Sequence, residues 1–138
     1  PNSHAAAEFF TQNNLPGPVF NNYDIGGYLA YFIFPQHKLF FDNRPEAYSS
    51  EFITSEYLSA LQQQNSWEAV VEKYNLQTIF FYRHDQVDGA QQFLIDRVAD
   101  PNWIPVYVDA YALIFVKNTP ENQEIINTFA LPQELFVY

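Results

Sequence analysis

The sequence has no cysteine, few basic residues, few glycines and no long apolar run. Without cysteine there can be no disulfide framework, thiolate zinc site or cysteine nucleophile. The longest apolar run, residues 28–34, is about a third of the roughly 20 residues that a membrane-spanning helix needs. The N-terminus shows neither the basic region nor the apolar stretch of a signal peptide. The chain as given is therefore predicted to be soluble, and it could be one part of a longer protein.

The shortage of basic residues leaves a strongly acidic chain. Six Lys and Arg stand against 16 Asp and Glu, and the formal net charge is −10. A nucleic-acid backbone is repelled by such a balance, and so is the surface of an anionic bilayer. We therefore expect no nucleic-acid partner.

The motifs of common catalytic and cofactor sites are absent from the sequence. Four glycines occur, and they form neither GxGxxG nor GxxxxGK[ST], the loops that cradle phosphates. His4, His37 and His84 are isolated, without a second His or Cys at metal-ligand spacing. No GxSxG elbow is present for a serine nucleophile. We expect no catalytic residue, metal or cofactor in this chain by itself.

Aromatic residues, by contrast, are abundant. Hydrophobic residues make up 48% of the 138 residues and aromatic residues 19%, with 14 Phe and 10 Tyr. A disordered chain carries far fewer, and the length is typical of one domain. Residues 1–138 are therefore predicted to form a single domain with a core built from rings.

Short apolar segments alternate with amphipathic ones along the chain. Strands are predicted at residues 19–21, 38–41, 76–82, 104–108 and 111–116, the last two joined as a hairpin by Asp109 and Ala110. Helices are predicted at residues 5–13, 28–34, 55–64, 67–74, 88–98 and from Thr119 onward. The alternation favours an α/β sandwich with a mixed sheet of about five strands, parallel crossovers first and a C-terminal hairpin, flanked by helices.

Three helix ends carry recognisable capping signals. Ser66 is positioned to cap the helix over residues 67–74, and Asn75 suits the left-handed position after it. Asp88 and Gln91 have the spacing of a capping box for the helix that ends near Val98.

Polar residues gather after the first two predicted strands, where ligand crevices form in open α/β sheets. The proposed ligand-binding residues are Asn21, Tyr23, Asp24, Asp42, Arg44 and Tyr48. Arg44 has the planar fork suited to a carboxylate or phosphate. Two alternatives stay open: Asp42 and Arg44 may equally form an internal pair that fixes their loop, and Asp24 may cap a helix. Arg83 and His84, after the third strand, could line the same edge.

The order and spacing of several short motifs resemble the soluble C-terminal region of polytopic GT-C-type glycosyltransferase-like proteins. The motifs are Asn-Asn-Tyr-Asp-Ile-Gly-Gly-Tyr-Leu at residues 21–29, Phe-x-Asp-x-Arg-x-x-x-Tyr at 40–48, Trp67 with Tyr74-Asn75, and Val-Tyr-x-Asp at 106–109 before Ala-x-Ile-Phe-Val at 112–116. Ile25 stands where the family often has an aromatic residue, and Asn43 where it often has Gly.

This resemblance implies a larger membrane protein. In that family a domain of many transmembrane helices precedes the soluble region and uses a polyprenyl-phosphate sugar donor, with its catalytic acids in membrane-domain loops. A more distant similarity is to the catalytic subunit of oligosaccharyltransferase, whose soluble domain opens with the peptide-reading motif Trp-Trp-Asp-Tyr-Gly. Residues 23–26 occupy a comparable place without the tryptophans.

The resemblance implies an accessory extracytoplasmic domain that is not catalytic alone. Its partners would be its own upstream transmembrane domain and a lipid-linked sugar or glycan acceptor. Two other hypotheses come from different classes: a free-standing module that binds a small ligand or has a structural role, and a divalent-metal hydrolase using Asp24 and Asp42.

Overall fold

The computed structural model describes residues 4–22 and 50–136. The helices in these ranges are α1 (His4–Gln12), α3 (Ser50–Gln62), α4 (Gln64–Tyr74), α5 (Ala90–Val98) and α6 (Gln123–Phe129). The strands are β1 (Val19–Asn21), β2 (Thr78–Tyr82), β3 (Trp103–Val108) and β4 (Ala112–Lys117). Short 3-10 helices, η1 (Pro120–Asn122) and η2 (Gln133–Phe136), flank α6.

The four strands form one mixed sheet in the order β1-β2-β4-β3. β1 pairs with β2 in parallel, and β4 is antiparallel to both β2 and β3. This arrangement confirms the predicted α/β fold, with the parallel crossover first and the hairpin at the end. The fifth predicted strand, at residues 38–41, and the predicted helix at residues 28–34 lie outside the described residues.

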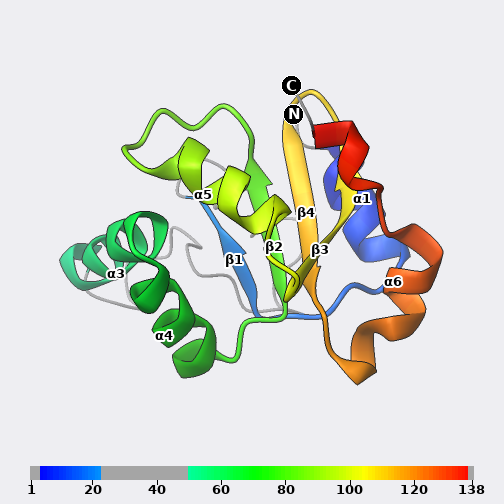
Figure 1. Cartoon of the computed structure of the whole chain (residues 1–138), viewed down its shortest axis with the longest axis horizontal. Coiled ribbons are helices and arrows are strands. Elements are labelled where there is room, and N and C mark those ends of the chain that lie inside the picture. The colour runs from blue at the N-terminus through cyan, green and yellow to red at the C-terminus, as the bar shows by residue number, and fades with distance from the viewer. Residues whose placement is uncertain (1–3, 23–49, 137–138) are drawn as a thin grey trace.

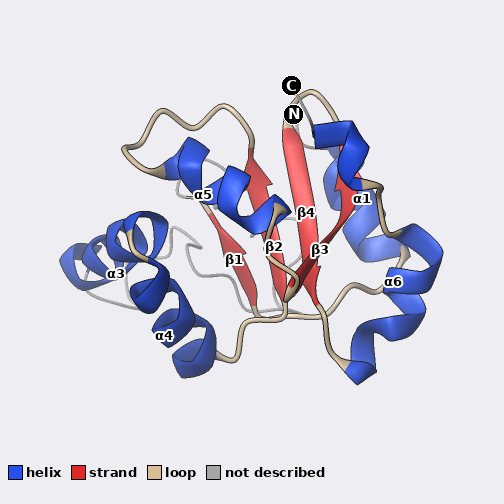
Figure 2. Cartoon of the chain, in the orientation of Figure 1, coloured by secondary structure: helices blue, strands red, loops and turns tan. Residues whose placement is uncertain are grey.

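Helices cover both faces of the sheet, so the fold has three layers (Figures 1 and 2). The alternation of side chains along β4 gives the sheet an apolar surface on each face. Leu113 and Phe115 join the core beneath α3, α4 and α5. Ala112, Ile114 and Val116 join the core beneath α1 and α6. Period-2 alternation of apolar residues on both faces is what a strand needs when it is buried on both sides.

The larger core is a cluster of rings, as the composition predicts. Phe20, fully buried on β1, lies 5.0 Å from Trp67, 5.6 Å from Tyr57 and 5.5 Å from Phe93, measured between ring centroids. These rings come from α4, α3 and α5. Contacts in the preferred edge-to-face and tilted geometries add to the burial of apolar area, so the cluster ties three helices to the first strand.

Two of the predicted helix caps are wrong. α4 begins at Gln64, with Gln63 rather than Ser66 at its N-cap, because Gln64 bonds both Glu68 and Arg97 and so stabilises an earlier turn. At α5 the N-cap is Gly89 with φ +91°, a backbone conformation that favours glycine. The Gln91 amide donates to the carbonyls of Arg83 and Asp85 in place of the predicted capping-box bond.

The other helix ends agree with the sequence. Asn75 takes the left-handed conformation after α4, with φ 52° and ψ 48°. Thr119 precedes Pro120 at the first position of η1, and α6 follows directly. The tail after α6 contains η2.

Candidate functional site

The sequence places the candidate site at the edge where β1 and β2 end. Asn21 is the one proposed residue within the described ranges. It is fully buried, and its Nδ2 donates to the Asn22 carbonyl at 3.2 Å. Because it is buried, Asn21 contributes to the packing of this edge. Its contact with a ligand stays a prediction. The other five proposed residues, Tyr23, Asp24, Asp42, Arg44 and Tyr48, lie outside the described ranges, as does the question of an Asp42–Arg44 pair.

Asn22 extends the parallel ladder with its side chain. Its Oδ1 accepts from the backbone N–H of Tyr82 at 2.8 Å, and its Nδ2 donates to the Tyr82 carbonyl at 3.1 Å. The amide therefore satisfies two backbone groups of β2 just after β1 ends. Buried backbone groups need such partners. Because Asn22 is fully buried, the point at which the chain leaves β1 is held firmly against β2.

Asp85 is the buried charge at the centre of this edge. Its side chain is nearly sealed, with 3% of the residue exposed. Oδ2 accepts from Asn22 Nδ2 at 3.0 Å and from the Tyr57 hydroxyl at 3.2 Å, and Oδ1 accepts from the Val87 N–H at 2.9 Å. Buried carboxylates are stable when their oxygens are satisfied in this way. Asp85 thus joins β1, α3 and the loop before α5.

Arg83 and His84 lie at the expected end of β2, but the described chain binds their polar groups internally. The Arg83 backbone N–H donates to the Tyr111 carbonyl at 2.8 Å, and its guanidinium donates to the Asp109 carbonyl. His84 Nε2 lies 2.7 Å from the Ala110 carbonyl. The two side chains therefore hold the β3–β4 loop, and their place along a ligand crevice stays a prediction.

Asp109 organises the same loop from within. Its Oδ1 accepts from the N–H groups of Tyr111 and Ala112, both at 2.8 Å, and its Oδ2 accepts from the Tyr107 hydroxyl at 2.6 Å. An Asp that bonds the backbone two residues ahead makes an Asx-turn. Burial raises the pKa of the Tyr107 phenol well above its usual value, and the hydrogen bond to Asp109 and the charge of that carboxylate raise it further.

This raised pKa predicts a loss of stability in alkali. Because the folded pKa of Tyr107 exceeds the unfolded value of about 10, its contribution is complete below about pH 10 and is lost as pH rises through the folded pKa. Urea midpoints measured from about pH 8 to about pH 11 should fall more steeply for the unaltered protein than for Tyr107→Phe. Parallel curves for the two proteins would contradict this assignment.

The described part of the edge is suited to positioning rather than to chemistry. Asp85 has its oxygens engaged, and the basic side chains nearby bind carbonyls. Within residues 4–22 and 50–136 no three His, Cys, Asp or Glu residues lie close enough to hold a metal ion. Over the same ranges no helix is long and apolar enough to cross a membrane. The network holds Asn22, just after β1, and Tyr57 of α3 against the end of β2.

Sequence reasoning missed Asn22, Tyr57 and Asp85. A signal existed for Asn22, which directly follows a strand as the second residue of an Asn-Asn pair. Asp85 likewise lies three residues beyond β2. No sequence signal connects Tyr57 to them, because it lies in a helix and reaches the edge only through the packing of α3.

Comparison with known proteins supports the fold. No protein-family profile matches the sequence, and no curated protein matches it. Among solved structures, the fold is similar to the C-terminal globular domain of oligosaccharyltransferase AglB-S2 from Archaeoglobus fulgidus. The superposition has a TM-score of 0.61, covers 83% of this chain and 95% of that domain, and has 9% sequence identity. At this identity the likeness establishes a common fold: the chain has the fold of an oligosaccharyltransferase C-terminal globular domain.

Proposed function

We propose that this chain is an accessory extracytoplasmic domain of a membrane glycosyltransferase-like protein, where it helps to dock or shape the acceptor side and is not catalytic alone. The observation that carries the proposal is the fold match, which spans 95% of a domain belonging to an oligosaccharyltransferase. The motif resemblance of residues 21–29 and 40–48 points in the same direction. Fold alone does not determine function, so the proposal depends on both.

The position of α1 indicates where a preceding membrane domain would be attached. α1 begins near the edge at which β1 and β2 end and runs to the opposite edge, where Pro16 accepts from Thr78 Oγ1 at 2.6 Å (Figure 1). Any polypeptide that precedes α1 would reach the domain at the end of the sheet where α1 begins, on the face opposite to α3 and α5. Under this proposal its partners are that membrane domain and a lipid-linked sugar or glycan acceptor.

The full-length gene product tests this function directly. The natural reading frame should continue upstream through several hundred mostly apolar residues. The full-length protein, with a C-terminal tag, should stay with membranes in alkaline carbonate. A protease added outside intact cells with a permeable outer layer should release the domain. A tagged cytosolic protein is the control for cell integrity, since it should remain uncut.

Two results would reject the proposal. One is a natural start codon next to the codon for Pro1, together with recovery of the protein in the soluble fraction. The other is turnover of a glycosyl acceptor by residues 1–138 alone, which would place the catalytic residues within this chain.

Arg44→Ala in the full-length protein then probes the candidate site: acceptor transfer should fall while membrane association is unchanged.

A further inference from the structure

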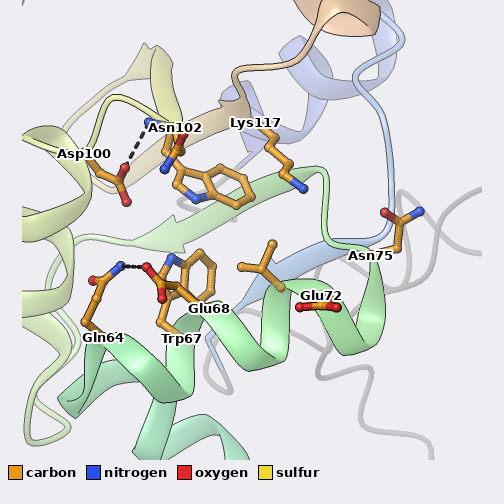
Figure 3. Close-up of a pocket in the computed structure, with 10 residues that line it drawn as sticks. Gln64, Trp67, Glu68, Glu72, Asn75, Asp100, Asn102 and Lys117 are labelled. Carbon is orange, nitrogen blue, oxygen red and sulfur yellow. Dashed lines mark hydrogen bonds between the residues drawn. The ribbon is translucent and has the colours of Figure 1, made fainter.

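A pocket of about 350 Å³ lies between α4 and the start of β3 (Figure 3). It is at the opposite end of the sheet from the Asn22–Asp85 network, because Lys117 follows Val116, the partner of Thr78 at the start of β2. One wall is α4, and the other is the segment from Asp100 to Trp103 together with Lys117 at the end of β4. Trp103 and Lys117 are register partners at this end of the sheet. The volume falls at the lower end of the range for small-molecule sites, which suits a monosaccharide or disaccharide.

Two buried indole rings line this pocket, and each has an N–H donor. Trp67 and Trp103 are buried, with 1% and 3% of each residue exposed. Over the described ranges neither indole N–H has a hydrogen-bond partner. Neither indole nitrogen is completely sealed from solvent. A buried Trp usually finds a partner for its N–H. Both donors are therefore left for an oxygen atom that enters the pocket.

The rim adds polar groups of every hydrogen-bonding kind. Within the described chain the side chains of Glu72, Asn102 and Lys117 make no hydrogen bond or ion pair. In Figure 3 the Lys117 side chain extends from β4 toward the space above α4, with Glu72 and Asn75 on the far side. A carboxylate accepts, an ammonium donates, and an amide does both. Such a mixture complements hydroxyl groups, which also donate and accept.

The pocket is lined by charges of both signs. Three carboxylates, Glu68, Glu72 and Asp100, and the ammonium of Lys117 face it. Asp100 lies 3.3 Å from Arg97, and Glu68 accepts from the neutral amide of Gln64 at 3.0 Å. An anionic ligand would meet the three carboxylates, and a cation would compete with Lys117. We therefore take a neutral ligand with several hydroxyl groups as the one that suits both kinds of group.

We infer that this pocket is a binding site for a neutral sugar, held through its hydroxyl groups by the indole N–H groups of Trp67 and Trp103 and by the rim residues Glu72, Asn102 and Lys117. The inference stands on the pocket alone and does not depend on the membrane context of the proposed function. It places a sugar site at the edge opposite to the one that the sequence indicates.

The test is a titration of the ¹⁵N-labelled chain with methyl glycosides of common hexoses and N-acetylhexosamines. At least one sugar should produce saturable shifts in the indole N–H signals of Trp67 and Trp103 and in the backbone amides of α4, with a Kd in the millimolar range, about 1–10 mM. Inorganic phosphate and lysine amide are the charged probes, and both should bind at least about tenfold more weakly.

Substitutions at exposed rim positions change binding without disturbing the core. Asn102→Ala and Glu72→Gln should each weaken sugar binding by about 3- to 10-fold, the loss of one hydrogen bond. Asn127→Ala and Glu124→Gln are the matched controls, exposed on α6 at the other face of the sheet, and should leave the Kd unchanged. Preserved dispersion of the amide spectrum shows that each variant is folded.

Three outcomes would overturn the inference. They are no saturable shift with any sugar up to about 50 mM, shifts that map away from α4 and Trp103, and equal or tighter binding of phosphate or lysine amide. Because the titration uses this chain alone, it can fail while the full-length protein is still found in membranes, and the converse also holds.

Discussion

Asp85→Ala is expected to lower the free energy of unfolding by about 3 kcal/mol, because it leaves several buried donors without an acceptor at about 1–3 kcal/mol each. Those donors are the Asn22 amide, the Tyr57 hydroxyl and the Val87 N–H. Asn22 keeps its two bonds to Tyr82, which limits the loss. The measurement is urea unfolding followed by tryptophan fluorescence.

Two further variants interpret that result. Asp85→Asn keeps one acceptor oxygen and should lose about half as much stability. Asp88→Ala, an exposed acid three residues away, should stay within about 0.5 kcal/mol of the unaltered protein. If Asp85→Ala changed stability no more than Asp88→Ala, the network would not be what holds this edge together.

Arg97→Ala should cost about 3–5 kcal/mol, the range for breaking one side of a buried ion pair. The Arg97 guanidinium lies 5.3 Å from the ring of Trp67 and 5.0 Å from that of Phe93, donates to Gln64 Oε1 at 2.6 Å, and has its Nε 3.3 Å from Asp100. Burial lowers the pKa of Arg97, and the carboxylate of Asp100 is the largest influence that opposes this.

The double variant separates charge from packing. Arg97→Met keeps apolar contact with Trp67 and Phe93 but leaves Asp100 without its cation, so it should remain destabilised. Adding Asp100→Asn removes the unpaired charge and should recover most of the loss, because apolar replacements of buried pairs are often close to neutral. Thermal or urea unfolding of the set measures this. A double variant no more stable than Arg97→Met would show that Asp100 matters little to the role of Arg97.

Local chemistry explains which parts of the fold were predictable. The strands over residues 19–21, 76–82 and 104–116 stood out because apolar runs of that length between turn residues have few other solutions. Asn75 was also predictable, since few residues accept a positive φ. The Ser66 cap and the Asp88–Gln91 capping box were wrong for one reason. Contacts outside the expected capping pattern decided both helix starts: Arg97 donates to Gln64, before Ser66, and Gln91 donates to the Arg83 carbonyl.

The same distinction between local pattern and distant contacts applies to the candidate site. The sequence located the edge at which β1 and β2 end, because a strand's carboxyl end can be located from its apolar pattern. It did not predict that Arg83 and His84 bind the carbonyls of the hairpin loop. It also left the pocket between α4 and Trp103 unseen. The walls of that pocket are far apart in the chain and meet only when α4 packs against the paired strands β3 and β4.

The sequence by itself determined the acidity of this protein, its ring-rich core and its alternation of helices and strands, because each depends on residue type and short-range periodicity. Only the tertiary structure decided that Asn22, Tyr57 and Asp85 share one network and that Trp67 and Trp103 line one pocket. Contacts between residues distant in the chain depend on how layers pack, and packing is specified by many side chains acting together rather than by any local pattern.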